Sequence, residues 1–205
     1  MKSIVCAIAL SLGLGSAALA EGSTWDVDSK HSSAQFTVKH MMVSNVPGQI
    51  GGIKGTIEYD GKNVETIKVK VTMDPATVNT NEPNRDEHLR GSDFFDVQKY
   101  PDMSFESTGI IPIASGGFKM SGKLTLHGIT KPVELNVDGP TEILKNKKKG
   151  IEEVGASATT TINRKEWGLS YNNVLDNGGV AVSEEVKITL NLEATRKMED
   201  KVSTK

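Results

Sequence analysis

The sequence predicts an all-β fold in which about eight antiparallel strands form a single domain. Three observations support this prediction. Apolar and polar residues alternate in one segment after another, turn-forming residues separate these segments, and no stretch long enough for a crossover helix lies between them. About eight strands with one apolar face each can close into an up-and-down barrel or stack as a sandwich, and the pattern alone does not decide between them.

Each predicted strand is a segment in which every second residue is apolar, as expected when one face of a strand is buried. For example, Val69 and Val71 alternate with Lys68 and Lys70. The alternating segments are 34–40, 53–59, 67–73, 103–113, 118–126, 133–137, 154–162 and 186–194.

Turn chemistry punctuates these segments and explains why each one ends. The turn-forming groups are Asp60-Gly61, Gly116-Gly117, His127-Gly128, Gly139-Pro140 and Asn177-Gly178-Gly179. Gly51 and Gly52 lie inside an otherwise extended stretch, where paired glycines indicate a bulge or a sharp bend.

One segment departs from the strand pattern and predicts a short helical cap. Asn84 is placed as an N-cap with Glu87 completing a capping box, and Gly91 ends the helix. Phe94 and Phe95 follow, and we expect their rings to pack under one end of the sheet and close it. The segment is interpreted either as a structural cap over the core or as a gate to a cavity.

The first residues are typical of a secretory signal peptide. Lys2 supplies the positive charge, residues 4–14 the apolar region, and residues 18–20 an A-x-A cleavage site. We therefore expect residues 1–20 to be removed and residues 21–205 to form one exported, soluble domain with its core at about 25–195. The single cysteine, Cys6, lies in the predicted signal peptide, so the mature chain is expected to lack disulfides and thiolate metal sites.

Composition and motif spacing argue against several classes of function. The 205 residues carry a formal net charge of −2 without a dominant basic block, which argues against binding to nucleic-acid phosphates. A hydrophobic fraction of 37% is enough for a sizeable core. The four histidines show no metal-site spacing, and no G-x-S-x-G motif is present. We therefore expect no metal, no required cofactor and no enzymatic activity.

Several motifs, taken together, resemble one known family. They are Trp25-Asp26-Val27-Asp28, His31-Ser32, Val38-Lys39-His40, Arg85-Asp86-Glu87-His88-Leu89, Asp93-Phe94-Phe95-Asp96, Tyr100-Pro101, 122–133 and 163–169. In order and spacing they resemble the YceI-like family of polyisoprenoid-binding proteins from Trp25 to Ala194. The chain departs from the family pattern in a lysine-rich loop at 142–153 and in Trp167, where a smaller aromatic residue is commoner.

The resemblance implies a lipocalin-like antiparallel barrel in the periplasm that holds a long isoprenoid chain, such as a quinone tail or a polyprenyl lipid. Inward-facing apolar residues would line the cavity: Phe36, Val38, Ile57, Val69, Val71, Met73, Phe105, Leu124, Leu126, Leu135, Val137, Ile188 and Leu190. A second group would lie at its mouth: His40, Met41, Met42, Arg85, His88, Phe94, Phe95, Arg164 and Trp167.

The sequence leaves alternatives open at these positions. Arg85 and His88 could bind a polar head group or only pin the helix, while Met41 and Met42 could form a flexible lip or belong to the core. Transient contact with a membrane surface through the lysine-rich loop and a homodimer also remain open. Two other functions keep the same fold: a stress-response interaction protein with a filled interior, and an enzyme acting on a lipid.

Overall fold

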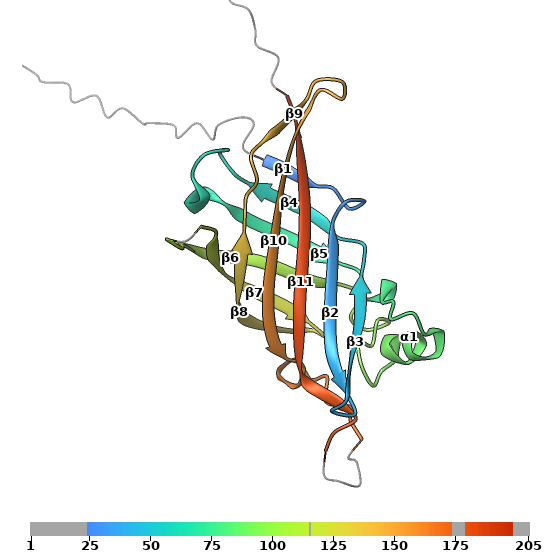
Figure 1. The fold of residues 1–205 in the computed structure, drawn as a ribbon. Helices are drawn as coiled ribbons and strands as arrows, with labels where there is room; N and C mark the ends of the chain where they lie inside the picture. Colours follow the sequence, from blue (N-terminus) through green and yellow to red (C-terminus); the bar gives the residue numbers. More distant parts are fainter. Residues whose placement is uncertain (1–23, 115, 174–178, 199–205) are drawn as a thin grey trace, which may run out of the picture.

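The protein is an antiparallel β-barrel with one short α-helix at its side (Figure 1). The computed structural model describes residues 24–114, 116–173 and 179–198. The predicted signal peptide at 1–20, including Cys6, and residues 177 and 178 of one predicted turn lie outside these ranges.

Eight strands form the closed ring, in the order β11, β1, β4, β5, β6, β7, β8 and β10, because β10 also pairs with β11. All of these pairs are antiparallel. The ring strands are β1 (Thr24–Val27), β4 (Lys54–Glu58), β5 (Lys68–Met73), β6 (Met103–Pro112), β7 (Phe118–Leu126), β8 (Ile129–Asp138), β10 (Ile151–Asn163) and β11 (Val182–Lys197). The predicted all-β, eight-stranded barrel is therefore confirmed, and the sandwich alternative is wrong.

Three further strands extend the ring. They are β2 (Ser33–His40), β3 (Ser44–Ile50) and β9 (Leu144–Asn146). Strand β2 continues along the edge of β11 below β1, and β3 pairs with β2. The end of the barrel near the β2–β3 turn is called the mouth end below, and β9 lies at the opposite end (Figure 1).

The paired glycines produce the bend that the sequence predicts, because β3 ends at Ile50 and β4 begins at Lys54. Gly52 has a φ of 66°, a conformation that L side chains rarely adopt. A Cβ atom there would lie 2.9 Å from the Cβ of Asp74. The bend therefore depends on glycine both for its backbone conformation and for its close packing.

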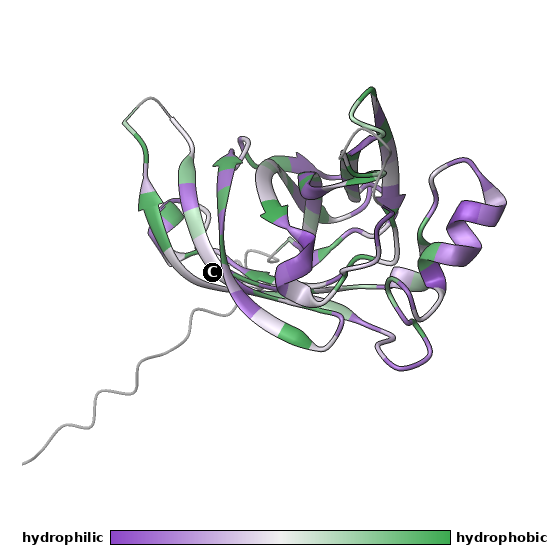
Figure 2. Ribbon diagram, turned by 90° about the horizontal axis from the view of Figure 1, so that it is seen from below, coloured by the Kyte–Doolittle hydropathy of each residue, from purple (hydrophilic) through white to green (hydrophobic). Residues whose placement is uncertain are grey.

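Helix α1 (Pro83–Arg90) lies beside β3 near the mouth end and ends at Gly91 as predicted. The predicted N-cap at Asn84 is wrong: Glu82 is the N-cap, and its carboxylate accepts hydrogen bonds from the backbone N–H groups of Asn84 and Arg85. Pro83 occupies the first turn, where a missing N–H costs nothing. Figure 2 shows that α1 is largely hydrophilic. No helix among the described residues is long and apolar enough to span a membrane.

The interior contains two clusters of buried side chains. The larger cluster surrounds Trp25, which is fully buried, donates from Nε1 to the backbone oxygen of Tyr59 at 3.0 Å and stacks beneath the guanidinium of Arg196. The smaller cluster lies toward the mouth end and contains Met103, Leu126, Ile162, Trp167 and Leu169. Most members of both clusters come from the inward apolar faces of strands, whereas Trp167 and Leu169 come from η3 and the segment after it.

Three short 3₁₀ helices connect the strands: η1 (Val64–Thr66), η2 (Pro75–Thr77) and η3 (Arg164–Trp167). The third follows β10 directly and carries two residues that the sequence assigns to the mouth, Arg164 and Trp167.

Candidate functional site

A cavity of about 370 Å³ lies inside the mouth end of the barrel. This volume is within the range of small-molecule sites, about 300–1,000 Å³. Its walls come mainly from β2, β3, β7 and β11, from α1 and η3, and from the segments that follow α1 and η3, with one residue each from β5, β6 and β10. Most of the lining side chains are apolar, and the charged ones come from α1 and η3.

A second cavity of about 140 Å³ lies deeper in the barrel and has no charged residue among its described lining. Met73, Leu124, Ile188 and Leu190 border both cavities, so the two spaces share a wall of side chains and lie one behind the other. Together they make an apolar interior that has charged groups only toward one end.

Partial burial of the inward side chains distinguishes this interior from a solid core. On β11, Val186, Ile188 and Leu190 are only half-buried although they face inward, whereas Lys187 and Thr189 face outward and are exposed. The inward side chains retain accessible surface because they border the cavity.

All thirteen residues predicted to line a cavity border one of these two spaces. Phe36, Val38 and Leu126 border the first, and Met73, Leu124, Ile188 and Leu190 border both. The others border the second: Ile57, Val69, Val71, Phe105, Leu135 and Val137.

Six of the nine predicted mouth residues border the first cavity: His40, Arg85, His88, Phe94, Phe95 and Arg164. The other three lie elsewhere. Met41 and Met42 have positive φ angles in the β2–β3 turn, and their side chains point to solvent with 42% and 56% exposure. Trp167 is only 2% exposed and packs in the smaller core cluster, so its large ring supports the fold at this end.

Arg85 projects from α1 into the first cavity and is held by Thr80. Its Nε donates to the Thr80 hydroxyl at 2.7 Å, and its Nη2 donates to the Thr80 backbone oxygen at 2.9 Å. Asp86 anchors the same threonine, since its Oδ1 accepts from the Thr80 N–H at 2.8 Å and from the hydroxyl at 2.6 Å. Asp86 is buried, so this contact fixes α1 against the segment before it.

Arg164 borders the same cavity and is 4% exposed. Its Nε donates to the backbone oxygen of Ser183 at 3.0 Å, and the two Nη atoms donate to the backbone oxygens of Leu169 and Val182. Burial lowers the pKa of this guanidinium, and the charge of Glu184 opposes that effect. The side chain joins η3 to the start of β11.

Three rings form an aromatic cluster at the mouth. The centroids of His88, Phe94 and Tyr171 lie 5.0–5.1 Å apart, and the two pairs that include His88 are T-shaped. The Nε2 atom of His88 also lies 2.9 Å from the carboxylate of Asp93. The cluster therefore connects the α1 segment to the segment after η3 across the cavity edge.

The sequence did not identify every residue of the lining. Thr80, Tyr171 and Asn173 contribute polar atoms, but they lie in segments without a strand period. Position in a loop next to the predicted motif at 163–169 was the one available signal for Tyr171.

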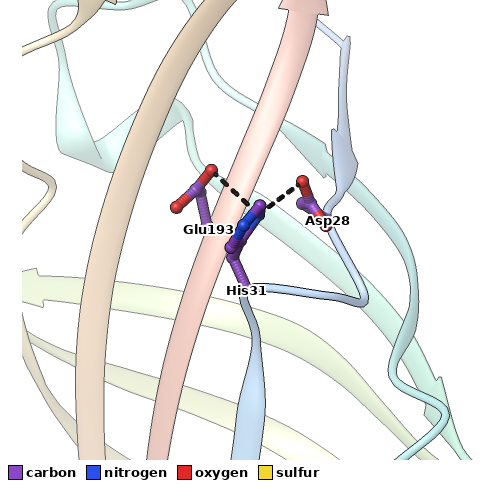
Figure 3. Close-up of side chains that lie close together, drawn as sticks. All are labelled: Asp28, His31 and Glu193. Atoms are coloured by element: carbon purple, nitrogen blue, oxygen red, sulfur yellow. Dashed lines mark hydrogen bonds and ion pairs between the residues drawn. The ribbon is translucent and has the colours of Figure 1, made fainter.

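A separate group of ionisable side chains lies on the barrel exterior at the end of β1 (Figure 3). The Nδ1 atom of His31 is 2.9 Å from Oδ2 of Asp28 and 3.6 Å from Oε1 of Glu193. The hydrogen bond to Asp28 and the two carboxylate charges raise the pKa of His31, while the hydrogen bonds from His31 and from the Lys30 N–H lower the pKa of Asp28.

These three groups are also types that ligate divalent metals, and their potential ligand atoms lie within 4.8 Å of one another. The ion pairs account for this arrangement without a metal. The sequence search for metal-site spacing could not have found the group, because Glu193 comes from β11 at the far end of the chain.

These observations define the chain as an antiparallel eight-stranded β-barrel with an apolar interior and a charged mouth. A family model described as the YceI-like domain matches residues 25–194. The chain belongs to this family. A Staphylococcus aureus relative, UPF0312 protein SAB2563, is 33% identical over 166 residues, which cover 81% of this chain and 94% of the relative.

Solved structures share the barrel. The YceI protein of Campylobacter jejuni is 31% identical with a TM-score of 0.61, over 79% of this chain and 90% of that one. Burkholderia cenocepacia BcnA is 22% identical with a TM-score of 0.68, over 82% and 98%. A domain from Saccharophagus degradans, described as polyisoprenoid-binding, is 16% identical with a TM-score of 0.59, over 85% and 98%. The last two likenesses concern the fold alone.

Proposed function

We propose that this protein is a lipid-binding barrel that sequesters or carries a polyisoprenoid chain. The observation that carries the proposal is the pair of adjoining apolar cavities with charged residues toward one end only. An amphipathic ligand with an apolar tail and a polar head matches this distribution. The Saccharophagus degradans domain, which is described as polyisoprenoid-binding, supports the view that a barrel of this fold can accommodate such a chain.

The cavity volume gives the scale of such a ligand. At about 30 Å³ per methylene-sized group, close to the volume share of a water molecule, the first cavity holds about a dozen such groups. Burying about ten of them would contribute about 8 kcal/mol, equivalent to micromolar affinity before the costs of association. A longer chain would extend toward the second cavity.

The proposal includes export to the periplasm. The features of residues 1–20 support export, and a carrier of insoluble lipid is useful in an aqueous compartment next to membranes. In this proposal the ligand is a quinone tail or a polyprenyl lipid. A homodimer stays a prediction of the sequence.

The β2–β3 turn supports a proposal of transient contact with a membrane surface. Met41, Met42 and Val43 are 42%, 56% and 86% exposed at the tip of this turn, next to the cavity that His40 borders. An exposed apolar tip beside the mouth would enter the interfacial region of a bilayer during lipid transfer. Replacing all three residues with serine should reduce cosedimentation with vesicles, and unchanged cosedimentation would contradict the contact.

Binding is proposed over catalysis because of how His88, one of the two histidines at the mouth, is engaged. Nε2 of His88 lies against the carboxylate of Asp93, and no described hydroxyl group shares a hydrogen bond with His88. A hydrolase would need a nucleophile activated by such a base.

Native mass spectrometry of the mature protein, purified from its own compartment, tests the proposed function. The expected result is a stoichiometric adduct that denaturing extraction releases as an isoprenoid lipid. A protein that stays free of adduct after incubation with quinones and polyprenyl lipids would overturn the proposal and favour the interaction-protein alternative.

A further inference from the structure

We infer that the ligand has an anionic head group, a phosphate or a carboxylate, which Arg85 and Arg164 bind at the mouth end. This inference rests on the proposed function and specifies the class of lipid that the same cavity takes.

The charges that border the first cavity have one sign. The charged residues of its described lining are Arg85 and Arg164, and it includes no aspartate or glutamate. The second cavity has no charged residue in its described lining. A lipid whose tail lies in the deeper space would therefore place its head among cationic groups.

Arg164 supplies a buried positive charge without a buried counter-ion. Its described hydrogen bonds go to three backbone oxygens, and Glu184, the carboxylate whose charge acts on it, is hydrogen-bonded to Lys165 and Asn163. A cation in an apolar interior is costly unless an anion pairs with it. A ligand phosphate or carboxylate would provide that anion.

Arg85 offers donors in a fixed position. Thr80 engages its Nε and Nη2 atoms, and no described residue accepts a hydrogen bond from its Nη1 atom. The guanidinium is thus held in place while one side of its donor fork stays available to a planar or tetrahedral anion.

Neighbouring carboxylates are engaged elsewhere. Asp86 bonds to Thr80, Glu87 pairs with Arg90 at 2.9 Å, and Asp93 pairs with His88 at 2.9 Å. Of these, only Asp86 is buried, and no described hydrogen bond joins its carboxylate to the Nη1 donors of Arg85.

A matched pair of ligands tests this inference: farnesyl monophosphate and farnesol, titrated into delipidated protein by calorimetry. Charge-assisted hydrogen bonds should make the phosphate bind about tenfold more tightly or better. Equal affinities would overturn the head-group inference and leave lipid binding intact. Failure of both ligands, and of longer polyprenyl lipids, would instead overturn the proposed function.

Variants of Arg85 and Arg164 test whether these side chains cause the preference for the phosphate. Arg85→Gln should remove most of the preference for the phosphate while leaving farnesol affinity unchanged, and Arg85→Lys should retain part of the preference. Arg90→Gln, on the same helix and outside the cavity lining, is the matched control and should keep the preference. Arg164→Gln is a second variant, with thermal unfolding to verify its fold. A preference that survives both Arg85→Gln and Arg164→Gln would overturn the assignment.

Inorganic phosphate separates a lipid site from a site for free anions. Because the tail supplies most of the binding energy in this inference, millimolar phosphate should not displace farnesyl monophosphate. If inorganic phosphate displaced bound farnesyl monophosphate as effectively as the lipid itself does, the site would be one for free anions. That result would overturn a lipid head group as the source of the anion.

Discussion

Trp167 donates a hydrogen bond from its indole Nε1 to the backbone oxygen of Leu124 at 3.2 Å, and this bond ties the 3₁₀ helix after β10 to strand β7. Strand β10 pairs with β8 over only three residues, 157–159, so the mouth end of this seam has little ladder pairing. The buried indole ring of Trp167 and its hydrogen bond compensate for the missing β8–β10 pairing at that end.

Replacing Trp167 with alanine should therefore destabilise the fold by about 3–5 kcal/mol, the usual cost of removing a large buried aromatic side chain. Chemical denaturation of the two proteins measures the difference. Glu166→Ala, one residue earlier and exposed, is the control and should change stability by less than about 0.5 kcal/mol. A stability loss as small as that of the control would show that Trp167 does not support the seam.

Filling the shared wall of the two cavities should block lipid binding. Ile188 borders both spaces, so Ile188→Trp would occupy volume that the ligand tail needs. We expect at least a tenfold loss of affinity for farnesyl monophosphate, equivalent to about 1.4 kcal/mol, with the barrel still folded. Calorimetry measures the affinity, and circular dichroism verifies the fold.

Leu144→Trp is the matched control for this prediction. Leu144 lies on β9 at the opposite end, is 63% exposed and borders neither cavity. The control should bind normally. If a folded Ile188→Trp protein also binds normally, the ligand does not enter the barrel.

Alternation of apolar and polar residues was enough to predict eight of the eleven described strands, because one face of each is buried and the period of two is visible in the sequence. Strands β1, β3 and β9 were not predicted. Val69 and Val71 are buried while Lys68 and Lys70 are exposed, as predicted. The helix end at Gly91 was also predictable. Its start was not, since Glu82 is an uncommon N-cap and the capping box at Asn84 offered a better sequence match.

Ring closure and the positions of loop residues could not be predicted in the same way. Closure depends on β10 and β1 both pairing with β11, which is a matter of register between distant segments. Trp167 was assigned to the mouth together with Arg164, from the motif at 163–169, but a large apolar ring gains more by packing inside. Met41 and Met42 show the reverse case, since a tight turn directs them to solvent.

The ion pairs of His31 should make stability depend on pH. A raised pKa in the folded state means that His31 contributes stability below its ordinary pKa of 6.5, and this contribution is lost as the pH rises through the raised value. The lowered pKa of Asp28 means that its contribution is present above 3.8 and is lost as the pH falls through the lowered value. The His31–Asp28 ion pair should therefore stabilise the fold most between pH 3.8 and pH 6.5, the ordinary pKa values of the two groups.

Thermal unfolding of the His31→Asn variant, measured over a range of pH, tests the predicted direction of this pH dependence. The difference in Tm from the unmodified protein should be largest near about pH 5 and should shrink as the pH rises from 6.5 through the raised pKa of His31, because the imidazole then loses its charge in the folded state as well. Asp28→Asn should remove most of the same pH dependence. A Tm difference that stays constant between these pH values would show that His31 acts by packing and not by charge.

Asp86 should control the mouth through Thr80. Its Oδ1 accepts two hydrogen bonds from Thr80, whose hydroxyl and backbone oxygen in turn hold Arg85. Asp86→Ala leaves the buried N–H of Thr80 without a partner, so we expect a loss of about 1–3 kcal/mol in the free energy of unfolding. The freed Thr80 would also release Arg85, and the preference for farnesyl monophosphate over farnesol should fall. Denaturation and calorimetry on the same sample separate the two effects: lower stability with an unchanged preference would mean that Thr80 does not position Arg85 for the ligand.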